Sequence, residues 1–250
     1  MPPRIVDADQ HIVEPPDMWT SRMSKKYTDV VPHVVDFPEG GHAWNFGGGE
    51  WVRPVGLLSG AGRSPKDFNW HQSYDDMFAS CYDPKERVRD MDIDGVDAAV
   101  LFPSIAMALS GCQDDGFYLD CFRTYNDAMW DWCQEGDPTR LYPAAIMPTL
   151  GTEIAMAELE RVSRMGYKGF MFNSWPSGGP HPSEADDPFW ALCQETETVV
   201  CMHGPGSGRA KTEVADAMAG ADTAKIVFQP THLRSLRSQL VPRDHPTDVR

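Results

Sequence analysis

The stretch RIVDADQHIVEPPDMW, residues 4–19, decides how the rest of the sequence is interpreted. Its apolar beginning predicts a short strand that runs directly into Asp7, Asp9 and His11. Carboxylates are costly to bury without partners, so the end of this strand is either solvated or part of a site that needs acids and an imidazole. Side chains two residues apart on a strand point to the same side. Asp9 and His11 are therefore expected to face the same space.

Four further apolar runs follow, and helical segments separate most of them. The runs lie at 98–102, 141–150, 167–173 and 198–204, and the helical segments lie at 84–94, 116–135, 152–166 and 187–197, with Asp83, Thr152 and Asp187 as expected N-caps. Continuously apolar runs are typical of strands buried on both faces of a parallel sheet. The alternation predicts an α/β fold, for which two architectures fit: an open doubly wound sheet, and a barrel of alternating strands and helices.

Residues 12–82 show no sustained period of two or 3.6. So long an irregular segment in a compact domain is more often functional than passive, and we interpret it as an insertion after the first strand. It either closes over the strand ends as a lid or packs at the periphery, held by its aromatic side chains. As a lid, it would place Trp44, Trp51 and Trp70 on the same side of the molecule as Asp9.

The composition limits the classes of partner. The 250 residues include 37 acidic and 22 basic side chains, a formal net charge of -15, which argues against an electrostatic grip on nucleic acid or an anionic membrane. No apolar run approaches the ~20 residues of a membrane span, the N-terminus lacks the pattern of a secretory signal, and the six cysteines form no C-x-x-C pair. We expect a cytoplasmic protein with reduced thiols that acts on a small molecule, and self-association as a homo-oligomer stays open.

Side chains with metal-binding chemistry occur where the predicted strands end. Ligand sites gather at the carboxyl ends of parallel strands, and His203 ends the fifth strand as Asp9 and His11 end the first. Two imidazoles and one carboxylate suit zinc or another divalent first-row metal. Two interpretations stand at this point: one divalent ion held by these three residues, zinc or alternatively manganese, or histidines with ordinary structural hydrogen bonds.

Four other residues are candidate substrate contacts. Asn173 and Trp175 follow the fourth strand, and Glu14 and Trp19 follow the first. Glu14 and Trp19 would shape the entrance of a pocket, although the start of a helix and core packing explain them equally well.

A rival motif is HGPGSGRAKT, residues 203–212. A phosphate-binding Walker loop needs glycines directly before the lysine and six residues before it, and Ala210 and Pro205 occupy those positions. The glycines also lack the spacing of the dinucleotide fingerprint, and no G-x-S-x-G elbow supplies a serine nucleophile. Nucleotide binding by a doubly wound protein is therefore the distant runner-up.

Taken together, four segments resemble the amidohydrolase superfamily: DADQHIVEPPDMW, ERVRDMDIDGVDAAVLFPS, YKGFMFN and VVCMHGPGSG. The nearer match is the amidohydrolase-related branch that includes aminocarboxymuconate-semialdehyde decarboxylase, and the resemblance covers residues 4–228. It implies a metal-dependent TIM-type barrel of eight strands, of which this chain would supply five or six, with KIVFQ (225–229) as the candidate sixth. We expect an incomplete barrel domain over 1–228 and a disordered or aberrant tail over 229–250.

The resemblance also implies a set of ligands. Asp9 and His11 match the two ligand positions that end the family's first strand, and His203 matches the ligand of the fifth. Some members carry a carboxylated lysine at the end of strand four, where this chain has Asn173, so the resemblance implies a single metal. The family's catalytic histidine and its aspartate base come from strands six to eight. We expect both beyond the end of a truncated chain, which leaves the catalytic residues unknown.

The chemistry implied by the resemblance has two forms. In one, a metal-activated water attacks a carbonyl carbon; in the other, the metal holds a carboxylate group while carbon is protonated. We therefore expect a metal-dependent hydrolase that acts on a small aromatic or unsaturated carboxylic substrate, with a non-oxidative decarboxylase as the alternative. A catalytically inactive truncated relative is a third interpretation.

Overall fold

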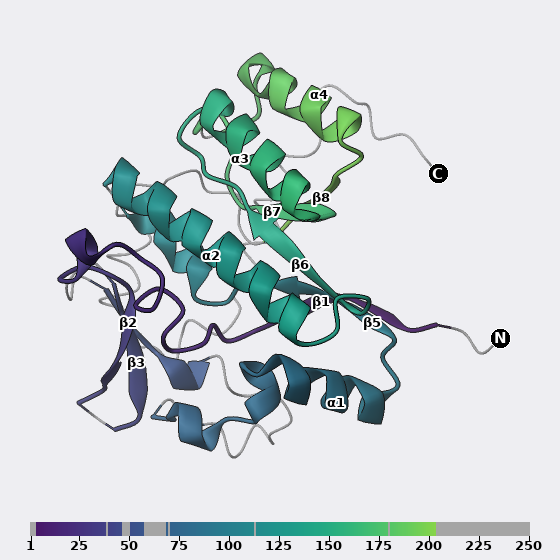
Figure 1. The fold of residues 1–250 in the computed structure, drawn as a ribbon. Helices are drawn as coiled ribbons and strands as arrows, with labels where there is room; N and C mark the ends of the chain where they lie inside the picture. The colour runs from purple at the N-terminus through teal and green to yellow at the C-terminus, as the bar shows by residue number, and fades with distance from the viewer. Residues whose placement is uncertain are drawn as a thin grey trace, which may run out of the picture.

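The computed structural model describes residues 4–38, 40–46, 51–57, 69, 71–112, 114–179 and 181–203. Within them, five strands form one sheet in the order β1-β5-β6-β7-β8 (Figure 1). The strands are β1 (Val6–His11), β5 (Ala98–Phe102), β6 (Leu141–Ile146), β7 (Gly169–Phe172) and β8 (Val199–Met202). Each pairs in parallel with the next along the chain, so all five predicted strands and their parallel pairing are confirmed.

The strand order decides between the two predicted architectures. A doubly wound sheet reverses its order at a switch point, whereas this sheet follows the order of the chain without reversal. Such a sheet curls progressively in one direction, as in a TIM barrel. The prediction of a TIM-barrel-like α/β fold, with five parallel strands in the described part of the chain, is confirmed. The candidate sixth strand (225–229) and the tail (229–250) lie outside the described residues.

Four α-helices accompany these strands in the described part of the chain. They are α1 (Pro84–Asp94), α2 (Asp115–Glu135), α3 (Thr152–Met165) and α4 (Asp187–Glu195). Helix α1 begins as predicted, because the Asp83 carboxylate accepts hydrogen bonds from the backbone N–H groups of Lys85 and Glu86. It ends at Gly95, whose φ of 71° is in the left-handed region that glycine adopts without strain.

The predicted N-caps of α3 and α4 are wrong by one residue. Thr152 and Asp187 are the first residues of their helices rather than the caps. Before α4, the fully buried carboxylate of Asp186 accepts hydrogen bonds from the backbone N–H groups of Ser177 and Ser183, at 2.8 and 3.0 Å. Asp186, the residue before α4, thus stabilises the preceding loop through its hydrogen bond from Ser177, nine residues earlier.

The segment between β1 and α1 contains a second sheet, which the sequence did not predict. Its antiparallel strands are β2 (His33–Asp36), β3 (His42–Phe46) and β4 (Trp51–Pro54), in the order β2-β3-β4. The chain also forms short 3-10 helices: η1 (Lys25–Tyr27), η2 (Val55–Leu57), η4 (Tyr74–Asp76), η5 (Ala79–Cys81), η6 (Ala106–Gly111) and η7 (Glu184–Asp186). Strands of four or five residues are too short to show a clear period of two within an irregular segment.

Trp44 connects this small sheet to the main core. Its ring packs edge-on against Trp19, with centroids 5.2 Å apart, and its Nε1 donates a hydrogen bond to the Tyr74 hydroxyl at 2.9 Å. Trp19 and Trp44 are both fully buried in one apolar cluster. Trp70 and the side chain of Trp51 lie outside the described part of the chain. Trp44 is therefore a core residue, and a lid over the strand ends stays a prediction.

Helix α2 provides the longest apolar face of the core. Its predicted stripe is buried: Tyr118, Cys121, Phe122, Tyr125, Met129 and Trp132. A second apolar cluster, around Phe170 and Phe189, lies beneath α3 and α4. The six cysteines are free thiols. Within the described ranges, no helix combines the length and the apolar character that crossing a bilayer requires.

Candidate metal site

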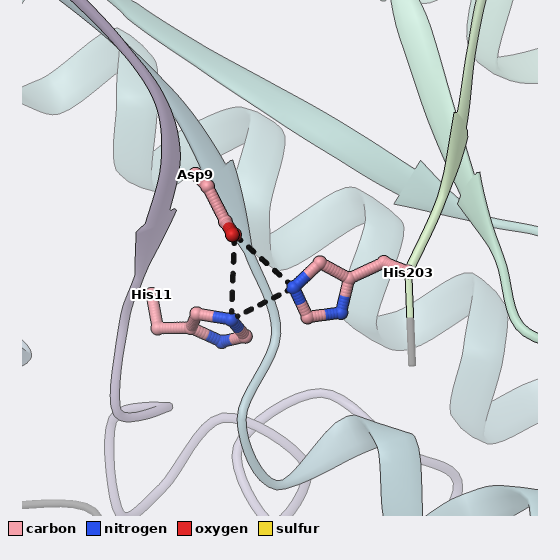
Figure 2. Close-up of side chains that lie close together, drawn as sticks. All are labelled: Asp9, His11 and His203. Carbon is pink, nitrogen blue, oxygen red and sulfur yellow. Dashed lines mark hydrogen bonds and ion pairs between the residues drawn. The ribbon is translucent and has the colours of Figure 1, made fainter. Parts of the chain in front are cut away.

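Asp9, His11 and His203 meet in one cluster (Figure 2). Asp9 and His11 belong to β1, and His203 follows β8 directly. These are the two outer strands of the sheet, so the side chains meet only because the sheet curls and brings the ends of its first and last described strands toward each other. The structure thus places together the three residues that the sequence predicted as metal ligands.

The spacing within the cluster suits a single ion. The Nε2 atoms of His11 and His203 are 3.1 Å apart, and the Asp9 Oδ1 atom lies 3.1 Å from the His203 Nε2 and 3.7 Å from the His11 Nε2. Three atoms at these separations share a point about 2 Å from each of them, which matches typical zinc–ligand distances of about 2.0–2.2 Å. Carboxylate oxygen and imidazole nitrogen are also ordinary ligands of divalent first-row metals. The residues present therefore fit one divalent ion.

His11 is held in a defined orientation. Its Nδ1 lies 2.8 Å from the Pro103 carbonyl oxygen, which only accepts hydrogen bonds, so Nδ1 carries a proton. In the neutral ring, Nε2 then has a free lone pair directed at Asp9 and His203. Burial lowers the pKa of His11, although the hydrogen bond to Pro103 opposes this shift. The neutral ring, which can bind a metal, is thereby favoured over the imidazolium.

His203 is held mainly by ring packing. Its ring stacks on Phe102 at the end of β5, with centroids 4.6 Å apart and an interplanar angle of 20°. Its Nε2 faces Asp9 Oδ1, whereas its buried Nδ1 has no hydrogen-bond partner among the described residues. Metal-bound histidines usually donate a hydrogen bond from the second ring nitrogen to an acceptor. His203 lacks such an acceptor among the described residues.

Asp9 lies at an irregularity in β1. The pairing of β1 with β5 runs from Asp7 opposite Ala99 to Gln10 opposite Leu101, so β1 contains one extra residue in this interval. Such bulges redirect side chains and are common near functional sites. The Asp9 side chain is 67% exposed, which leaves the cluster open to solvent on this side.

The four predicted substrate contacts lie outside this cluster. Glu14 and Trp19 are fully buried, and the Trp19 Nε1 donates to the Cys121 carbonyl oxygen at 3.1 Å. Asn173 is half-buried after β7. Trp175 packs in an aromatic group, 5.5 Å from Phe172 and 6.4 Å from Trp190 between ring centroids. Packing thus accounts for the positions of Trp19 and Trp175, and substrate contact stays a prediction for all four.

Sequence reasoning missed Arg87, which anchors the end of β1. From α1, its guanidinium donates to the Ser80 carbonyl at 2.7 Å, to Gln10 Oε1 at 3.0 Å and to the His11 carbonyl at 2.9 Å. Burial lowers the pKa of this guanidinium. In the sequence, Arg87 looks like a surface residue of a charged helix, and no local signal marks its contact with a strand 76 residues earlier.

A cavity of about 490 Å³ lies between β1 and α1. His11 and Ser104 line it, together with Arg87 and the acidic pair Asp90 and Asp94. Its volume falls within the range of about 300–1,000 Å³ that is usual for small-molecule sites. Space of this size is therefore available next to one member of the cluster.

Comparisons with known proteins agree with the fold. Residues 6–225 match the sequence model of the family described as Amidohydrolase. No curated protein sequence gives a significant match. An amidohydrolase from Mycobacterium avium subsp. paratuberculosis is a similar solved structure, with a TM-score of 0.65 and 20% identity over 94% of this chain and 65% of that chain.

A second similar structure is 5-carboxyvanillate decarboxylase from Novosphingobium aromaticivorans, solved with manganese and 3-methoxy-4-hydroxy-5-nitrobenzoic acid. Its TM-score is 0.52, with 18% identity over 88% of this chain and 56% of that chain. The chain thus spans between about half and two thirds of the length of these two relatives. At this level of identity the likeness shows a shared fold.

Proposed function

Since the chain belongs to the amidohydrolase family, we propose that Asp9, His11 and His203 hold one divalent metal ion in the active site of a metal-dependent hydrolase. The observation that carries this proposal is the spacing of the three donor atoms, 3.1, 3.1 and 3.7 Å apart, which suits one ion. The substrate we propose is a small carboxylic acid, aromatic or unsaturated.

The chain's own residues would prepare the site in separate ways. Asp9 contributes a negative charge that offsets part of the charge of a cation. His11, with Nδ1 committed to Pro103, presents a neutral Nε2. His203 is fixed by its stacking on Phe102. When bound, zinc would lower the pKa of water to about 7, and either metal would polarise a carbonyl group. Zinc fits the two-histidine, one-carboxylate set, and manganese is the alternative.

Non-oxidative decarboxylation is the second candidate activity. Its support is the manganese-containing decarboxylase whose fold resembles that of this chain. The same three ligands would serve either reaction, because both need a divalent cation next to a carboxylic substrate. A catalytically inactive relative is the third candidate.

Metal analysis of the purified chain tests the proposal. We expect about one equivalent of zinc or manganese in the wild type and a loss of this metal in His11→Ala. His33→Ala is the matched control, because His33 lies in β2 and its Nδ1 pairs with the Val31 carbonyl, outside the cluster. Metal content that is the same in wild type and His11→Ala would overturn the assignment.

Turnover assays separate the candidate activities. Metal-loaded protein is incubated with a panel of aromatic carboxylic acids and their amide or lactone derivatives. Release of carbon dioxide supports the decarboxylase, and release of a new carboxylate supports the hydrolase. Tight metal binding without turnover in either assay supports the inactive relative.

A further inference from the structure

A buried carboxylate links the segment after β1 to the loop after β5. The Glu14 side chain is fully buried. Its carboxylate accepts hydrogen bonds from three consecutive backbone N–H groups, those of Ser104 at 3.1 Å, Ile105 at 2.9 Å and Ala106 at 2.8 Å. These residues lead into η6, so one side chain fixes the course of the chain where it leaves β5.

The same loop holds the His11 ring. Pro103, directly before the three anchored residues, accepts the hydrogen bond from His11 Nδ1 at 2.8 Å. The Ser104 hydroxyl lies 3.5 Å from the same nitrogen. A displacement of this loop would therefore move the group that orients the imidazole. Because Glu14 and His11 are only three residues apart, both contacts join the same two segments of the chain.

The backbone of Glu14 is itself fixed from the other side. The Tyr74 hydroxyl donates to the Glu14 carbonyl at 2.7 Å, and Trp44 Nε1 donates to that hydroxyl. The small antiparallel sheet is thus connected to Glu14 through Trp44 and Tyr74. An anchor held on both sides is able to keep the loop in one position.

We propose that Glu14 is a positioning residue for the metal site: its carboxylate holds the 103–106 loop so that the Pro103 carbonyl keeps His11 Nε2 directed at Asp9 and His203. The proposal rests on the proposed function, since it explains how one of the three ligands is oriented. Contacts that orient a ligating histidine typically change metal affinity by about 10–100-fold when removed.

A purely structural role would have a different signature. Glu158 is also fully buried, but it lies on α3 and pairs with Arg161, Arg123 and Asn126. It has no contact with the loop that orients His11 among the described interactions. Glu158→Gln therefore serves as a matched control, because it removes the charge of a buried carboxylate that does not belong to the cluster.

Cobalt(II) titration of wild type, Glu14→Gln and Glu158→Gln tests the proposal. The intensity of the cobalt absorption bands gives the dissociation constant, and thermal unfolding gives the stability of each variant. We expect Glu14→Gln to weaken cobalt binding about 10–100-fold and Glu158→Gln to leave it unchanged, even where both lower the melting temperature. If Glu14→Gln does not fold, Glu14→Asp replaces it; the shortened side chain should weaken binding in the same direction.

A second readout uses the metal-free protein. The ¹⁵N chemical shifts of the His11 ring report its tautomer, and we expect Glu14→Gln to shift them while Glu158→Gln does not. Wild type that binds no cobalt would overturn the proposed function, and the ring shifts would still test the positioning role. Cobalt affinity and His11 shifts that are unchanged in Glu14→Gln, or equally changed in Glu158→Gln, would overturn the proposal.

Discussion

His11 and His203 are 192 positions apart in the chain, yet their Nε2 atoms lie 3.1 Å apart. They lie at the carboxyl ends of the first and last strands of the described sheet, so their close approach reflects the curl of that sheet. Two imidazole nitrogens this close repel each other unless a proton or a metal ion lies between them. The pair is thus a sensitive site at which to test the metal hypothesis.

Loss of His203 or of Asp9 as a ligand should reduce metal affinity. We expect His203→Ala and Asp9→Asn each to weaken zinc binding by at least about 100-fold, because each removes one of three donors. This is more than the effect of removing a group that only contacts a ligand, which is about 10–100-fold. Asp17→Asn is the control, since Asp17 is exposed and lies outside the cluster. Isothermal titration calorimetry measures the affinities of the wild type and the three variants, and equal affinity of Asp9→Asn and Asp17→Asn would contradict Asp9 as a ligand.

Arg87→Lys should affect both stability and the metal site. The guanidinium donates to three acceptors at once, and an ammonium cannot reproduce this planar fork. We expect the free energy of unfolding to fall by about 1.5–3 kcal/mol and zinc affinity to fall as the His11 backbone loosens. Urea unfolding and calorimetry measure the two effects.

Arg89→Lys provides the comparison for this prediction. Arg89 is on the same helix and forms an exposed ion pair with Glu86, and such pairs contribute about 0–1 kcal/mol. A loss of stability in Arg89→Lys as large as in Arg87→Lys would show that the effect belongs to the helix rather than to its contact with β1.

The sequence was sufficient for the parts of this fold that rest on local patterns. The five barrel strands are continuous apolar runs, and Asp83 and Gly95 mark the ends of α1 through cap chemistry that acts over a few residues. The spacing of Asp9 and His11 on one strand predicts that their side chains face the same space, and the structure places them together. Their meeting with His203 followed from the rule that the carboxyl ends of parallel strands gather at one edge.

Other features depend on contacts that no local pattern encodes. The burial of Arg87 and Glu14 arises from hydrogen bonds to segments 76 and about 90 residues away. In the sequence, Arg87 looks like a solvated charge, and Glu14 is a candidate for the entrance of a pocket. The small sheet of β2, β3 and β4 was missed because its strands are short, and its contact with the main core through Trp44 joins segments that are distant in the chain.

Trp19→Phe should separate packing from substrate contact. Trp19 is fully buried, and the change removes both its hydrogen bond to the Cys121 carbonyl and part of its edge contact with Trp44. We expect the free energy of unfolding to fall by about 1–3 kcal/mol with unchanged zinc affinity. Chemical unfolding and zinc titration check this. A variant of normal stability with a raised KM for its substrate would instead identify Trp19 as a substrate contact.

The Glu14 carboxyl should make stability depend on pH in a specific direction. Burial raises its pKa from 4.5 to about 7, against the effect of its hydrogen bonds from the loop. A raised pKa means that the folded protein binds this proton more tightly than the unfolded chain does. Its contribution to stability is therefore fully present below about pH 4.5 and is lost as the pH rises through about 7.

Comparison with Glu14→Gln isolates this effect, because the glutamine does not titrate. We expect the free energy of unfolding of the wild type, relative to that of Glu14→Gln, to fall by about 3 kcal/mol between pH 4.5 and pH 8. Urea unfolding of both proteins across this range, with a chelator present so that metal binding does not contribute, measures the difference.

Glu160→Gln, which changes an exposed residue of α3, gives the background dependence on pH. A difference between wild type and Glu14→Gln that stays constant with pH would show that Glu14 has the same pKa in the folded and unfolded chain, and that its hydrogen bonds from the loop fully offset the effect of burial.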